Sequence, residues 1–317
     1  MSRTAALILA LVALALSSPA PAGARVLNVE FKFTPFTGDA AKDDVVATVP
    51  GVAHVVVNGI PIADQDVAAD TLPVLFEARE IAPAVWLPVE SLGSILRRGT
   101  NTLKIVFEPT DPAAKYKAQL RWAAVTDDVA ETNDGAGRST ATNQAAEGVD
   151  AREATGALVM ERSFDAPFAA DRPWHHAKAE TALSAADRAA LAAIVEARLA
   201  AFAPDFARVH ALLEAGGPDG VDVANVRKLK CLEAAYVAGL RIAGPAKGQL
   251  DLVVTGHAVV VIRAKDGPLF RPADPDLFAQ VQGGEDVQMC AAAALMQAYP
   301  PRLLVVRDPK GGWSIVD

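Results

Sequence analysis

Cysteine and aromatic residues are scarce in this chain of 317 residues, which holds two Cys and only 6% Phe, Trp and Tyr. Two cysteines are too few for a small disulfide-rich scaffold or for a zinc site built from four cysteines. Basic residues are outnumbered, 30 Lys and Arg against 38 Asp and Glu, and the net charge of −8 excludes a globally basic surface for nucleic acid. Since 51% of the residues are hydrophobic, the chain can still bury a core, and its length predicts about two domains.

Common catalytic motifs are missing as well. The sequence contains no Gly-x-Gly-x-x-Gly, no P-loop, no His-Glu-x-x-His and no Gly-x-Ser-x-Gly. A site assembled from residues far apart in the chain stays possible. No enzyme class is favoured.

Residues 1–24 are predicted to be a secretory signal peptide. Arg3 precedes an apolar run at 5–16, and the segment 22–24 (AGA) has the small-x-small pattern of a cleavage site. As a helix the run spans about 18 Å, too short for a hydrocarbon core of about 30 Å. Cleavage near Ala24 would leave a periplasmic or secreted protein without a membrane span; an uncleaved anchor is the alternative.

Export changes the interpretation of the two cysteines. Cys231 and Cys290 would be the only pair in an oxidising compartment, which predicts a disulfide between them. Both lie among small residues, Cys290 directly before the alanine run 291–294, so their backbones could approach closely. Two free buried thiols are the alternative.

Residues 25–178 read as a β-sandwich domain. Apolar and charged residues alternate at 29–33 (VEFKF), the period of a half-buried strand, and Asn58-Gly59 between two apolar runs predicts a hairpin. The stretch 127–155 has almost no large apolar residue and is expected to be a flexible polar insertion, within this domain if the strand-like residues 158–164 close the sandwich.

Three segments of this domain carry a resemblance: 55–59 (VVVNG), 92–96 (LGSIL) and 98–105 (RGTNTLKI). Together they resemble the galactose-binding-domain-like jelly roll, whose members include sugar-binding domains attached to glycosidases. The resemblance covers about 50 residues and implies a fold more than a ligand. Members that bind sugars use loop aromatics and polar groups, sometimes with a structural calcium ion.

Residues 181–317 are expected to form an α+β domain with three leading helices and an antiparallel sheet. Ser184 and Asp187 resemble a capping box at the first helix, which is followed by helices from 204 to 216 and from 223 to 240. The predicted strands are 250–255, 258–263, 303–307 and 313–316, with a helix at 286–298. The last two strands form a hairpin that is similar to the end of the nuclear-transport-factor-like or SnoaL-like cone fold.

Four residues are candidates for ligand binding. Trp174, His175 and His176 form the densest polar and aromatic cluster, which could line a cleft; the simpler interpretation is a linker with its aromatic side chain packed down. Adjacent histidines in an extended chain point to opposite sides, so no metal site is assigned to them. His257 is expected on the concave face of the C-terminal sheet.

Acidic and aromatic residues of the first domain offer fewer candidates. The pair 43–44 and the residues Asp64 and Asp66 could hold a structural calcium ion in the sandwich loops, or they are solvated turn residues. No other cofactor is predicted. Trp86 and Trp122 lie inside predicted strands, which favours core positions over a sugar-binding platform.

The sequence therefore favours an exported, non-catalytic binding or envelope-associated module whose partner is a glycan or a protein of the cell envelope. The alternative is a small-molecule or enzymatic site in the concave sheet of the C-terminal domain. A third hypothesis is a scaffold that docks another envelope protein through an exposed apolar patch.

Overall fold

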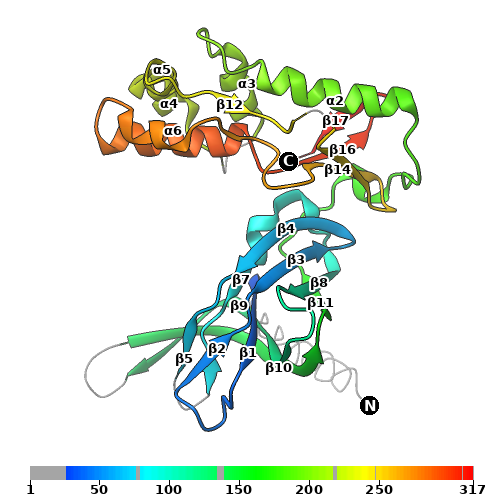
Figure 1. The fold of residues 1–317 in the computed structure, drawn as a ribbon, viewed down its shortest axis with the longest axis vertical. Coiled ribbons are helices and arrows are strands. Elements are labelled where there is room, and N and C mark those ends of the chain that lie inside the picture. The colour runs from blue at the N-terminus through cyan, green and yellow to red at the C-terminus, as the bar shows by residue number, and fades with distance from the viewer. Residues whose placement is uncertain are drawn as a thin grey trace, which may run out of the picture.

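The computed structural model describes residues 26–75, 79–133, 139–216, 220–246, 248–308 and 310–316. Figure 1 shows a β-rich N-terminal region and a C-terminal region that carries the helices. The predicted boundary between two domains, near residues 178–181, stays a prediction. The predicted signal peptide at 1–24 lies outside the described residues. No helix in the described part of the chain is long and apolar enough to cross a membrane.

The N-terminal region contains a curled antiparallel sheet of seven strands. Its order is β10-β9-β1-β2-β5-β6, and β7 also pairs with β1. The middle of β1, residues 30–33, pairs with β7 and its last residues pair with β2, so the sheet curls beside β1. The strands are β1 (Val26–Thr37), β2 (Val45–Thr48), β5 (Thr71–Leu75), β6 (Glu80–Ile81), β7 (Val85–Pro88), β9 (Lys115–Asn133) and β10 (Ser139–Thr155).

A second antiparallel sheet faces the first and has the order β11-β8-β3-β4. The predicted hairpin is confirmed, since Asn58 and Gly59 join β3 to β4 with φ of 51° and 76°. Its strands are β3 (Gly51–Val57), β4 (Ile60–Val67), β8 (Gly99–Pro109) and β11 (Leu158–Ala166); the 3-10 segments η1 (Val89–Ile95) and η2 (Pro173–His176) complete the region.

Side chains from both sheets form one buried core. Phe31 and Phe33 of β1 are almost completely buried, and their rings lie 5.2 Å from Phe164 and 5.7 Å from Phe107 of the other sheet. Because side chains alternate along a strand, Glu30 and Lys32, which each precede one of these phenylalanines, face the other side of the seven-stranded sheet. The alternation read from the sequence therefore defines an inner and an outer face.

The polar stretch at 127–155 contains more regular structure than expected. Residues 127–133 end β9, and residues 139–155 belong to β10, which pairs with β9 along its length. The structure thus places strands where the sequence predicted a flexible insertion. A strand poor in large apolar residues gives little periodicity, which explains why the pattern missed it.

The C-terminal region combines helices with a small antiparallel sheet of order β13-β14-β16-β17. The third predicted helix is two helices, because Lys230 adopts a left-handed conformation (φ 50°) that ends one helix and begins the next. The elements are α2 (Ala185–Leu199), α3 (Ala207–Ala215), α4 (Val223–Leu229), α5 (Cys231–Val237), β12 (Ile242–Ala243), β13 (Leu250–Val254), β14 (Val259–Ala264), β15 (Arg271–Pro272), η3 (Pro275–Gln280), α6 (Glu285–Ala298), β16 (Leu303–Arg307) and β17 (Trp313–Ile315).

The predicted disulfide is present. Cys231 at the start of α5 is bonded to Cys290 of α6, with 5.9 Å between their Cα atoms, a separation typical of disulfides. Cys231 is completely buried, and Ala291 and Ala294 beside its partner are also buried. The small side chains let the two helices approach closely, as the sequence predicted.

Buried side chains cover both faces of the C-terminal sheet at β14 and β16. Val260, Ile262 and Val305 belong to the core beneath the helices. Val259 and Val261 point the other way and belong to the core of the N-terminal region. The two regions therefore share buried apolar surface.

A polar cluster ties the start of α2 to the C-terminal hairpin. The predicted capping box is confirmed, because Ser184 and Asp187 each bond to the other's backbone N–H. The Asp187 carboxylate also accepts hydrogen bonds from Ser184 Oγ (2.7 Å), Arg307 Nη1 (3.0 Å) and Trp313 Nε1 (3.2 Å). The hydrogen bond from Ser184, followed by that from Arg307, holds the pKa of Asp187 well below its usual range.

This cluster predicts an acid-dependent loss of stability. Because the pKa of Asp187 is lower in the folded state than in the unfolded state, its ionised carboxylate stabilises the fold at pH values above the unfolded pKa of about 3.9. This contribution is lost as the pH falls from that value toward the folded-state pKa. We expect Asp187→Asn to flatten the decrease in unfolding free energy between pH 5 and pH 3, measured by urea denaturation. Arg227→Gln, which breaks an exposed pair with Glu214 (2.7 Å), should leave the decrease unchanged. Identical pH dependence in wild type and Asp187→Asn would refute this role.

Candidate functional site

The predicted ligand residues Trp174 and His175 have a structural role. His175 is buried, and its Nε2 lies 2.7 Å from the carbonyl oxygen of Ser94, while its Nδ1 accepts a hydrogen bond from the backbone N–H of Arg172 (3.1 Å). Trp174 packs against the N-terminal core, with its ring 4.3 Å from that of His175. These contacts fasten η2 to η1, as the simpler interpretation predicted.

The other two predicted ligand residues, His176 and His257, do not lie beside Trp174 and His175. His176 is exposed. His257 packs against the β3–β4 turn, where its Nε2 would lie 2.7 Å from a Cβ atom added at Gly59. The structure thus places His257 where the two regions meet, and the predicted site in the concave C-terminal sheet stays a prediction.

Three of the four acidic residues predicted as calcium ligands interact with neighbouring groups. Asp43 accepts a hydrogen bond from the backbone of Asp39 (2.8 Å), and Asp44 pairs with Arg79 at 3.3 Å. Asp64 lies 2.7 Å from Nδ1 of His54. Within the described ranges, no group of three or more His, Cys, Asp or Glu side chains could hold a metal ion.

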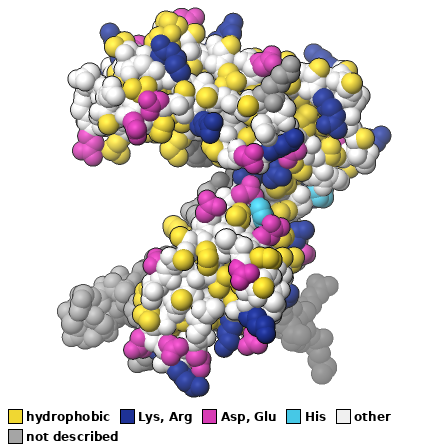
Figure 2. Space-filling model, in the orientation of Figure 1, with side chains coloured by type: hydrophobic (Ala, Val, Ile, Leu, Met, Phe, Trp, Pro, Cys, Tyr) yellow, Lys and Arg dark blue, Asp and Glu magenta, His cyan; other side chains and the backbone are white. Residues whose placement is uncertain are grey.

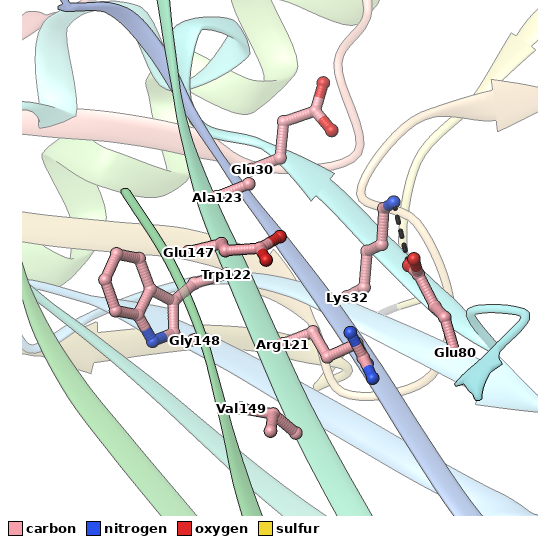
Figure 3. Close-up of a pocket in the computed structure, with 9 residues that line it drawn as sticks. All are labelled: Glu30, Lys32, Glu80, Arg121, Trp122, Ala123, Glu147, Gly148 and Val149. Atoms are coloured by element: carbon pink, nitrogen blue, oxygen red, sulfur yellow. Dashed lines mark hydrogen bonds and ion pairs between the residues drawn. The ribbon is translucent and has the colours of Figure 1, made fainter. Parts of the chain in front are cut away.

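A groove on the outer face of the seven-stranded sheet is the best candidate site. It has a volume of about 150 Å³, and β1, β6, β9 and β10 line it. Figure 3 shows its charged side chains on one side of the sheet, with the indole of Trp122 on the other. We call it the outer groove, and its charged residues are Glu30, Lys32, Glu80, Arg121 and Glu147.

Strand pairing explains how the outer groove is assembled. Lys32 of β1, Arg121 of β9 and Val149 of β10 are neighbours across the sheet, so their side chains share a row. Glu30 and Glu147 flank Ala123 in the next row on the same face. The groove therefore presents hydrogen-bond donors in one row and acceptors in the adjacent row.

The curl of the sheet supplies one wall of the groove. Glu80 of β6 reaches back to β1, where its Oε1 lies 3.1 Å from Lys32 Nζ. Arg121 differs from Lys32, because its Nε is buried and lacks a hydrogen-bond partner among the described residues. An N–H group left without a partner in the described chain is unfavourable, and the residue that carries it lines the groove.

The hollow continues along β9 and β10. A second cavity of about 380 Å³ on the same face is lined by Lys117, Gln119 and Glu153, among others. Gln119 and Arg121 are alternate residues of β9, so the two cavities follow one another along the strand. The Oε1 atom of Gln119 is also buried without a partner in the described chain. The site is therefore elongated, with an unpaired acceptor beside an unpaired donor.

An exposed tryptophan lies on the same face of the sheet as this groove, one strand away from Lys32 in its lining, which corrects the prediction that Trp86 lies in the core. Trp86 is 54% exposed, whereas its neighbours Val85 and Leu87 are buried. It is the cross-strand partner of Lys32, so its indole lies on the outer face in the same row as Arg121. Trp122 behaves as predicted, since it is partly buried against the core.

Searches against protein-family models, curated proteins and solved structures gave no match for this chain.

Proposed function

We propose that the protein is a non-catalytic binding protein whose outer groove holds a saccharide chain of the cell envelope. The observation that carries this proposal is the exposed Trp86 beside a row of hydrogen-bonding side chains. A sugar ring has apolar C–H faces and polar hydroxyl edges, and an exposed indole next to charged groups complements both. Carboxylates accept from hydroxyls, while Arg and Lys donate to them.

The shape of the outer groove supports an extended ligand. The cavities lined by Arg121 and by Gln119 lie along the same strand, and hydroxyl groups can both donate to and accept from polar side chains of this kind. The resemblance of the N-terminal region to the galactose-binding-like jelly roll agrees with a sugar ligand. The site lies on the sheet face, rather than in the loops that the resemblance implies.

The proposal also places the protein outside the cytoplasm. The leader-like sequence at 1–24 and the Cys231–Cys290 disulfide support export, because disulfides persist in oxidising compartments.

Removing the indole of Trp86 is expected to abolish most saccharide retention. The mature chain would be screened by affinity electrophoresis against neutral and acidic envelope polysaccharides, and the best ligand titrated by calorimetry. Loss of an anchoring aromatic side chain costs about 2 kcal/mol, so Trp86→Ala should weaken binding roughly 30-fold.

The matched control is Val159→Ala, which truncates another exposed apolar side chain on the other sheet. It should bind as tightly as the wild type, whereas Arg121→Gln should bind more weakly. Retention on no polysaccharide, or equal retention by Trp86→Ala, would refute the proposed site. Release of reducing sugar by the wild type, lost in Glu30→Gln or Glu147→Gln, would refute its non-catalytic character.

A further inference from the structure

A second cavity, separate from the outer groove, lies where the two regions meet. It has a volume of about 350 Å³, and we call it the inter-region cleft. Strand β4, strand β7 and segment η1 contribute one wall, and the C-terminal hairpin contributes the other. Its apolar lining includes Ile62, Leu87, Leu92, Leu304, Ile315 and Val316.

Arg302 is the charged residue in the lining of this cleft. Its side chain is only 15% exposed, and burial lowers its pKa. Nη1 donates a hydrogen bond to the carbonyl oxygen of Pro61 (3.1 Å). The buried Nε has no hydrogen-bond partner in the described part of the chain. One guanidinium edge of this cation therefore lacks a matched acceptor.

The nearest carboxylate does not fill that position. Oδ2 of Asp64 lies 3.9 Å from Arg302 Nη2, beyond hydrogen-bond distance. Oδ1 of Asp64 faces His54 at 2.7 Å, and Oδ2 is 3.7 Å from Arg263, which also pairs with Asp251 at 2.9 Å. Figure 2 shows acidic, basic and histidine side chains gathered at the narrow waist between the two regions.

We propose that the inter-region cleft binds an amphipathic carboxylate, such as a fatty acid, with its chain in the apolar cleft and its carboxylate on Arg302. The Asp64 carboxylate, 3.9 Å from Nη2, offsets the burial of this cation only in part, and a ligand carboxylate within hydrogen-bond distance would complete the compensation. Carboxylate geometry matches two parallel N–H groups of a guanidinium. The cleft volume lies within the range of small-molecule sites, roughly 300–1,000 Å³.

The experiment uses decanoate as the probe and the mature chain as the protein, with dissociation constants measured by calorimetry. The wild type should bind decanoate, and Arg302→Met should bind it at least tenfold more weakly. Decanol has the same alkyl chain as decanoate but no charge, so the wild type should bind it more weakly than decanoate. The dissociation constant for decanol should change little in Arg302→Met. Arg263→Met is the matched control, because Arg263 belongs to the same charge cluster but does not line the cleft; it should bind decanoate as the wild type does.

A second variant separates a lost site from a lost fold. Leu92→Glu places a carboxylate in the apolar lining without altering Arg302, and it should also weaken decanoate binding. Thermal melting of each variant checks that it is folded. The proposal is overturned if the wild type binds no decanoate, if folded Arg302→Met binds it as tightly as the wild type, or if decanol loses as much affinity as decanoate.

Discussion

Replacing both cysteines, as Cys231→Ala/Cys290→Ala, is expected to lower the free energy of unfolding by about 4 kcal/mol, because the disulfide closes a long loop between cysteines 59 positions apart. In the chain-entropy account, the bond restricts the unfolded chain more than the folded one. The two Cα atoms already lie at a normal disulfide separation. Most of the loop-closure contribution should therefore appear as measured stability.

Thermal melting with and without reductant tests this expectation. At about 2–4 °C per kcal/mol, the double variant should melt on the order of 10 °C below the wild type. Reductant should lower the wild type to a similar value and leave the variant unchanged. The intact mass of protein recovered from outside the cytoplasm should show one disulfide and an N-terminus at Arg25. Equal melting temperatures in wild type and variant would contradict the stabilising role.

Phe107→Ala is expected to destabilise the N-terminal region by about 3–5 kcal/mol, the usual cost of a cavity left by a buried aromatic ring. Phe107 of β8 is completely buried between the sheets. Its ring lies 5.7 Å from Phe33 and 5.6 Å from Tyr116, both on the seven-stranded sheet. Truncation therefore removes contacts that hold the two sheets together.

Urea denaturation measures this loss. Phe107→Leu keeps most of the apolar volume and should lose much less than Phe107→Ala. Val159→Ala, at an exposed position, should stay within about 0.5 kcal/mol of the wild type. If Phe107→Ala were no less stable than Val159→Ala, the shared core between the sheets would be contradicted.

Local signals in the sequence were sufficient for much of the fold. The alternation at 29–33 predicted the strand β1 and its buried face, and Asn58-Gly59 predicted a hairpin, because both residues tolerate positive φ. Ser184 and Asp187 predicted the start of α2 through a reciprocal pair of hydrogen bonds. Such features depend on residues close together in the chain.

Other features depend on tertiary contacts or lack a local signal. The left-handed residue Lys230 divides a helix whose apolar spacing predicted one continuous element. Val85, Trp86 and Leu87 are all apolar, so no alternation showed that the middle residue faces outward. The sequence therefore predicted a core position for the residue that now carries the proposed function.

The candidate site could not be read from the sequence, because it is assembled from distant strands. Glu80 of β6 meets Lys32 of β1 across 48 residues, and Arg121 joins them only through the pairing of β9 with β1. By contrast, Trp174 and His175 are adjacent in sequence and were predicted to bind a ligand, but they pack inward and fix η2 in place. For the candidate site, the register of the paired strands was therefore more informative than the clustering of polar residues along the sequence.

Indole N–H resonances offer the most direct test of the central claim that Trp86 and the outer groove bind a saccharide. The chain has four tryptophans, and the Trp86 signal can be assigned by its loss in Trp86→Phe. Titration with the best saccharide ligand should shift the Trp86 resonance and leave those of Trp174 and Trp313, which lie away from the groove, in place. An unmoved Trp86 resonance at saturating ligand would contradict the proposed site.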